Sequence, residues 1–117
     1  MAERFNFDSI RDFVGQDNET IVEMVEIFLQ TVPESLQFLN ESFQNKDYRK
    51  LSYHAHKLKS SIDLLNIQEL TGEIREIEND ANKLENIEQI PEKVNHLNNV
   101  LSDLLPKIQA AKEKLSQ

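Results

Sequence analysis

Apolar residues recur at steps of three and four along nearly the whole chain, as in Ile21, Met24, Val25 and Phe28. Because an α-helix has about 3.6 residues per turn, this spacing gathers the apolar side chains on one helical face. Two glycines and three prolines in 117 residues leave few positions for the tight turns of a β-rich fold. The spacing therefore predicts an all-α protein.

The apolar pattern divides into one short segment and four long ones. We expect a short helix at about 8–14 and long helices at about 18–45, 47–65, 67–84 and 88–115. The connections between the long segments are short, which forces consecutive helices to lie antiparallel. The sequence thus predicts one domain over residues 1–117, an up-down-up-down antiparallel four-helix bundle with a short N-terminal helix. The same rhythm also suits a helical pair that dimerises as a coiled coil.

Charge and hydropathy exclude several classes of function. Thirteen Lys and Arg against 21 Asp and Glu give a net charge of −8, which repels nucleic-acid phosphates and anionic lipid, so no nucleic-acid partner is expected. The apolar runs are too short to span a membrane, and the first residues, MAERFNFDS, lack the apolar stretch of a signal peptide. The absence of cysteine excludes thiol chemistry. We expect a cytoplasmic protein with no membrane partner.

The segment SYHAHKLKSS, residues 52–61, places two histidines on the second long helix. His56 points about 135° away from the centre of the apolar face, toward water, whereas His54 lies near the edge of that face as a boundary residue. Side chains at i and i+2 project to nearly opposite sides of a helix, so the two rings cannot hold one metal ion without a distant third ligand. No metal site is predicted.

An exposed imidazole is a nucleophile in its neutral form. Lys59, one turn after His56, could balance the negative charge of a group such as phosphoryl once it is attached to the ring. Ser60 is small, leaves room beside the ring and could donate a hydrogen bond to a bound oxyanion. A second interpretation of Lys59 remains open, a solvated ion pair with Asp63 at i+4.

The stretch AHKLKSSIDLLNIQEL, residues 55–70, resembles the signature of histidine-containing phosphotransfer (HPt) domains. In that signature a histidine is followed by x-Leu-Lys-Gly and later by a Leu-Gly turn. His56 falls on the phosphoacceptor, Leu58 on the core leucine and Lys59 on the phosphate-facing lysine. The lead-in D-Y-x-x-L is present as Asp47, Tyr48 and Leu51, and EIREIE, ending at Glu78, resembles the family's acidic end to the following helix.

Two positions depart from the family pattern. The glycine after the lysine is Ser60, which adds a β-carbon and a hydroxyl where a partner approaches. The glycine that closes the helix is Asn66, and asparagine is the next best residue for a left-handed C-terminal cap. Neither change removes the acceptor or the cation.

The resemblance implies a histidine phosphotransfer protein, a phosphoprotein of two-component signal transduction. His56 would accept a phosphoryl group from an aspartyl phosphate on one receiver domain and pass it to another. The implied partners are response-regulator receiver domains and a hybrid sensor histidine kinase, with Mg²⁺ bound by the receiver and no cofactor on this chain. Two glycines, Gly15 and Gly72, cannot build a nucleotide-binding loop, which agrees with a passive carrier rather than an enzyme.

By resemblance, the docking surface comes from the short first helix, the start of the long one and the exposed face of the histidine helix. The candidates are Ile10, Phe13, Val14, Ile21, Lys57, Ser60 and Ser61. Two rival functions remain open: a helical adaptor or dimerisation bundle without chemistry, and an enzyme that uses His56 as a general base with Asp63 as the only nearby acid.

Overall fold

The computed structural model describes residues 4–117, and within that range all regular structure is helical. The elements are α1 (Asp8–Val14), α2 (Asn18–Gln44), α3 (Tyr48–Leu64), α4 (Gln68–Lys83), the 3₁₀ turn η1 (Ile87–Gln89) and α5 (Ile90–Leu115). This confirms the all-α prediction. The helix that contains Pro33 continues through it to Gln44, so the proline does not break α2.

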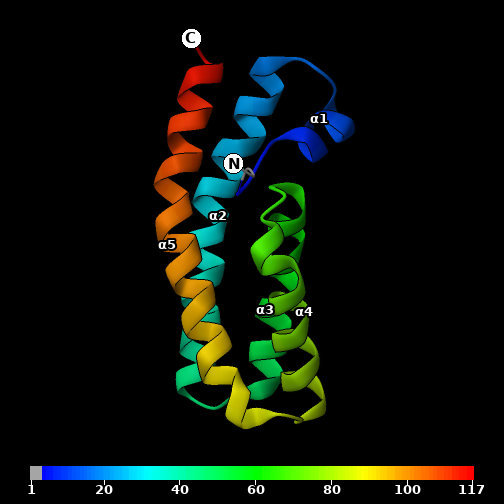
Figure 1. Cartoon of the computed structure of the whole chain (residues 1–117), viewed down its shortest axis with the longest axis vertical. Coiled ribbons are helices and arrows are strands. Elements are labelled where there is room, and N and C mark those ends of the chain that lie inside the picture. The colour runs from blue at the N-terminus through cyan, green and yellow to red at the C-terminus, as the bar shows by residue number, and fades with distance from the viewer. Residues whose placement is uncertain (1–3) are drawn as a thin grey trace.

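The four long helices lie along the long axis of a body of 45 × 27 × 22 Å (Figure 1). Helix α2 packs against α3 and α5, and α4 also packs against α3 and α5. The short helix α1 lies at one end, where it contacts α2 and α3. Each long helix therefore has two long neighbours and one face left for solvent.

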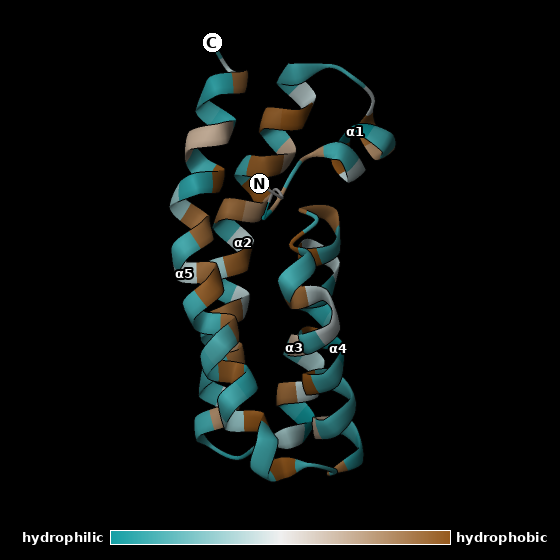
Figure 2. Ribbon diagram, in the orientation of Figure 1, coloured by the Kyte–Doolittle hydropathy of each residue, from teal (hydrophilic) through white to brown (hydrophobic). Residues whose placement is uncertain are grey.

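The core is built from the apolar face of each helix, and Figure 2 shows hydrophobic and hydrophilic bands alternating along the ribbons. In α3 the buried residues are Leu51, Ala55, Leu58 and Ile62, at steps of three and four, and each is at most 1% exposed. Burying these side chains fixes the rotation of α3 about its axis. The opposite side of the helix, which carries His56, is consequently turned to solvent.

An N-cap residue begins α3, and a residue in the left-handed conformation follows its C-terminal end. The Asp47 carboxylate accepts a hydrogen bond from the Lys50 backbone N–H at 3.2 Å, as an N-cap does. Asn66 has φ 52°, the left-handed conformation expected of its cap position. Its side chain contacts Asn6 at 2.7 Å and Ser9 at 3.2 Å. These hydrogen bonds connect the end of α3 to Asn6 and to the first turn of α1.

Candidate functional site

His56 stands on the solvent side of α3. Its side chain is 63% exposed, although Ala55 and Leu58 on the same helix are completely buried. The outward orientation expected from the spacing of apolar residues is therefore observed. An exposed ring on a rigid helix is accessible to a partner without any rearrangement of the core.

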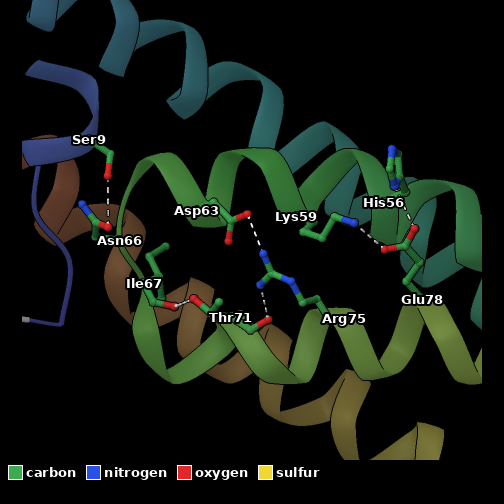
Figure 3. A network of polar contacts seen from close by, with 9 residues as sticks. All are labelled: Ser9, His56, Lys59, Asp63, Asn66, Ile67, Thr71, Arg75 and Glu78. Carbon is green, nitrogen blue, oxygen red and sulfur yellow. Dashed lines mark hydrogen bonds and ion pairs between the residues drawn. The ribbon is translucent and has the colours of Figure 1, made fainter. Parts of the chain in front are cut away.

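Glu78 of α4 contacts both functional side chains of α3 (Figure 3). Its Oε2 lies 2.7 Å from Nδ1 of His56, and its Oε1 lies 2.8 Å from Nζ of Lys59. One carboxylate thus bridges the imidazole and the ammonium group. The sequence analysis named Glu78 only as the last residue of EIREIE, by resemblance to the acidic end of a helix, and did not predict this bridging contact; in the structure α4 continues to Lys83.

Lys59 does not form the ion pair with Asp63 that the i+4 spacing allowed. Asp63 instead accepts a hydrogen bond from Arg75 of α4 at 3.0 Å. Lys59 is 24% exposed and turns toward α4 and Glu78. Its charge therefore lies on the His56 side of the helix.

The protonation state of Glu78 determines the tautomer of His56. Burial acts to raise the pKa of Glu78, but the hydrogen bonds from Lys59 and His56 outweigh it and hold the pKa below its ordinary value. The carboxylate is thus ionised at neutral pH and can only accept hydrogen bonds. Nδ1 of the neutral ring must then carry the proton, which leaves the lone pair on Nε2.

The two neighbouring histidines lie in different environments, as the sequence predicted: His56 is exposed and His54 is half-buried. His54 lies at the boundary between core and solvent, where its ring stacks on Phe38 with centroids 5.5 Å apart and meets Tyr53 edge-on at 5.0 Å. Burial first, and then the charges of Lys57 and Lys50, lower the pKa of His54. Ser60, one turn beyond His56, is exposed as a small neighbour of the ring.

A second histidine, on α5, has a similar contact with a carboxylate of α4. Nδ1 of His96 on α5 lies 2.8 Å from Oε1 of Glu73, and the His96 side chain is 48% exposed. The nearby Lys93 contacts two carboxylates, Glu76 at 2.8 Å and Asp80 at 3.3 Å. His96 therefore resembles His56 in being exposed and in contacting a carboxylate, but among residues 4–117 no cation shares that carboxylate.

Two of the proposed docking residues require correction. Ile10 and Ile21 are fully buried, because Ile10 points into the bundle from α1 and Ile21 begins the core face of α2. Neither can present its side chain to a partner. Phe13 is 76% exposed, and Val14 is half-buried. On α3, Lys57 is exposed and Ser61 is half-buried.

Comparison with known proteins identifies the family. A family model described as Hpt domain matches residues 23–111, well over half of the chain. The chain belongs to the Hpt domain family, whose members carry out histidine phosphotransfer in two-component phosphorelays with receiver domains and kinases. No curated protein and no solved structure matches the chain.

Two further findings concern residues 4–117 alone. None of the helices there is both long and apolar enough to cross a membrane. Nor does this part of the chain gather three or more His, Cys, Asp or Glu side chains in a geometry that could hold a metal ion.

The contact of Glu78 with its two partners predicts a pH-dependent contribution to stability. The folded-state pKa of Glu78 is lowered, so the unfolded chain binds its proton more readily, and the stabilisation is complete above the unfolded-state pKa of about 4.3. Glu78→Gln should lower the free energy of unfolding by about 1 kcal/mol at pH 7. The difference from the wild type should shrink as pH falls through the lowered pKa. Urea denaturation of both proteins from pH 7 to 3 measures this, and a difference that does not change with pH would contradict it.

Proposed function

We propose that this domain carries a phosphoryl group on Nε2 of His56 between aspartates of two response-regulator receiver domains. A hybrid sensor histidine kinase would supply the group through its own receiver. The observation that carries the proposal is the exposed His56 ring with Nδ1 held 2.7 Å from an ionised carboxylate that also contacts Lys59. This arrangement leaves a nucleophilic nitrogen accessible beside a cation.

The transfer is a displacement at phosphorus. The Nε2 lone pair attacks the phosphorus of the aspartyl phosphate, the phosphorus–oxygen bond breaks, and the aspartate leaves as a carboxylate. The ring becomes cationic while Nδ1 keeps its proton, and the Glu78 carboxylate stabilises this positive charge. The reverse step regenerates the neutral ring when a second aspartate attacks the phosphoryl group.

Lys59 balances the negative charge of the phosphoryl group. Its Nζ already lies beside Glu78, whose other oxygen contacts the His56 ring. A short movement of the flexible lysine stem brings the ammonium group from the carboxylate to a phosphoryl oxygen. Ser60 leaves space beside the ring and offers a hydroxyl donor.

The remaining components belong to the partner. Mg²⁺ and its carboxylate ligands would be supplied by the receiver. This domain would contribute a nucleophile and a cation, and would act in the cytoplasm as a carrier and not as an enzyme.

We further propose that α2 to α5 form the up-down-up-down antiparallel bundle expected from their short connections. The pairwise packing of the long helices and the course of the chain in Figure 1 support this arrangement.

Incubation with a phosphorylated receiver domain tests the proposed function. We expect phosphate to appear on this protein in an acid-labile, alkali-stable form, as a phosphoramidate bond at histidine requires. Absence of label with several receivers would favour the adaptor function. A label that resists acid would place the phosphate on a hydroxyl group and contradict the proposal.

Lys59→Ala should slow phosphoryl transfer by about tenfold to a hundredfold without abolishing it. The estimate corresponds to the loss of one charge-assisted contact of about 1.5–3 kcal/mol in the transition state. Rapid-quench measurement of transfer from a phosphorylated receiver gives the rate. Lys107→Ala, which removes an exposed lysine of α5, is the control and should leave the rate unchanged. Equal rates for Lys59→Ala and the wild type would show that Lys59 has no part in the transfer.

A further inference from the structure

Two ion pairs lie side by side between α3 and α4 (Figure 3). Lys59 contacts Glu78 at 2.8 Å, and Asp63 contacts Arg75 at 3.0 Å. Lys59 and Asp63 lie on α3 at i and i+4, and Arg75 and Glu78 lie on α4 at i and i+3. Residues at these separations are neighbours on one helical face. Each of the four charges therefore has one oppositely charged neighbour on the other helix and one on its own.

The same four charges could pair in a second way. Lys59 could pair with Asp63 within α3, at a spacing that allows an ion pair on a helix. Arg75 could then pair with Glu78 within α4. This second pairing would draw the Lys59 ammonium group along α3, away from His56. The observed pairing across the two helices is thus the one that places the cation beside the proposed phosphoacceptor.

Two hydrogen bonds hold the Arg75 side chain. Its Nη2 donates to the Asp63 carboxylate at 3.0 Å, and its Nη1 donates to the backbone carbonyl of Thr71 at 2.9 Å. Thr71 precedes Arg75 by one turn of α4, so the second bond fixes the orientation of the planar guanidinium group. Among residues 4–117, Arg75 is the only salt-bridge partner of Asp63. Without the guanidinium group, the Asp63 carboxylate would be free to attract Lys59 from one turn away.

The pair of Arg75 and Asp63 is exposed. Their side chains are 49% and 40% exposed, and ion pairs between exposed groups add little to the free energy of unfolding. The larger effect of this pair is on the position of charges. It neutralises a carboxylate that would otherwise compete with Glu78 for Lys59.

We propose that Arg75 is a positioning residue for phosphoryl transfer. It holds the Asp63 carboxylate and thereby keeps Lys59 beside the proposed phosphoacceptor. This inference rests on the proposed function and extends it to a residue that contacts neither the His56 ring nor the phosphoryl group. Lys59 acts on the phosphoryl group, and Arg75 acts only through Lys59.

The rate of transfer from a saturating phosphorylated receiver tests this role. Arg75→Gln should slow the transfer about twofold to fivefold, less than Lys59→Ala does, because the cation is still present but is shared with Asp63. Arg75→Gln/Asp63→Asn should restore the wild-type rate, since the competing carboxylate is gone. Asp63→Asn alone should leave the rate unchanged. Lys107→Gln, which removes one cation from an exposed pair on α5, is the control for net charge and should also leave it unchanged.

Rescue by the second substitution separates positioning from a structural role. If loss of the pair merely loosened the contact between α3 and α4, Arg75→Gln/Asp63→Asn would be as slow as Arg75→Gln, and the proposal would be overturned. An unaltered rate in Arg75→Gln, or an equal fall in Lys107→Gln, would overturn it as well. Circular dichroism of each variant verifies that the bundle remains folded.

The pKa of Glu78 gives a readout that needs no phosphoryl transfer. Burial raises this pKa, and the hydrogen bond from Lys59 is the largest effect that lowers it. The pKa, followed through the ¹³C chemical shift of the carboxyl carbon, should rise in Arg75→Gln because Lys59 leaves Glu78. It should be the same in Lys59→Ala and Lys59→Ala/Arg75→Gln, because Arg75 has no effect without Lys59. An equal rise with and without Lys59 would mean that Arg75 acts directly on Glu78, and would overturn the proposal.

The two readouts separate this inference from the function beneath it. Labelling of the wild type at His56, with an unaltered rate and an unaltered Glu78 pKa in Arg75→Gln, would overturn only the positioning role. Absence of labelling at His56 would overturn the proposed function itself. The pKa of Glu78 would still test whether Arg75 holds Lys59 in place.

Discussion

His56→Gln should abolish phosphoryl labelling by a phosphorylated receiver and leave the fold unchanged. Glutamine has no nucleophilic nitrogen, so the transfer has no acceptor. The His56 side chain is 63% exposed and packs little, so its replacement should change the free energy of unfolding by less than about 0.5 kcal/mol. Labelling followed on a gel and thermal denaturation of the same samples measure the two effects.

His96→Gln is the matched control for this experiment. It removes a histidine that is also exposed and also contacts a carboxylate of α4, but from α5. Labelling should persist at the level of the wild type. If His96→Gln removed the label and His56→Gln kept it, the phosphoacceptor would be His96. A large loss of stability in His56→Gln would show that the ring supports the core.

Leu58→Ala should cost about 2–5 kcal/mol of the free energy of unfolding, as truncation of a fully buried core residue does. Leu58 is completely buried, so truncation removes apolar contacts and leaves a cavity among the helices. Urea denaturation followed by circular dichroism gives the difference. Ser60→Ala, two residues later on the exposed side, should change stability by no more than about 0.5 kcal/mol. A cost below about 1 kcal/mol for Leu58→Ala would contradict the orientation of α3.

The orientation of α3 could be predicted because the spacing of apolar residues within one helix is enough to define its buried face. Four buried residues at steps of three and four define its inner face, and the position of His56 then follows from helical geometry. The same spacing in α2 already joins Ile21 to Val25 and Phe28 in the core. Assigning Ile21 to the docking surface was therefore wrong on evidence that the sequence contained.

Helix α1 was harder to orient from sequence. It has only seven residues, about two turns, and too few repeats to define a buried face. Ile10 is buried and Phe13 is exposed, an outcome that depends on how α1 lies across the end of the bundle. That placement depends in turn on the hydrogen bonds of Asn66 with Asn6 and Ser9, which connect distant parts of the chain.

The bridging role of Glu78 could not be predicted from spacing. Glu78 lies 22 residues after His56 and on a different helix. The contact requires a particular rotation and axial offset of α4 against α3, which apolar periodicity does not give. The conformation at the end of α4 could not be predicted from sequence either. Leu84 adopts φ 56° and ends the helix in a left-handed conformation that leucine rarely takes.

Phosphorus–nitrogen NMR of the phosphorylated, ¹⁵N-histidine-labelled protein tests the central claim most directly. The claim is that Glu78 holds the proton on Nδ1 of His56 and leaves Nε2 to accept the phosphoryl group. We predict a single phosphorylated histidine, His56, with phosphorus coupled to Nε2 and a proton retained on Nδ1. Coupling to Nδ1, or a phosphoryl group on any other residue, would contradict this account.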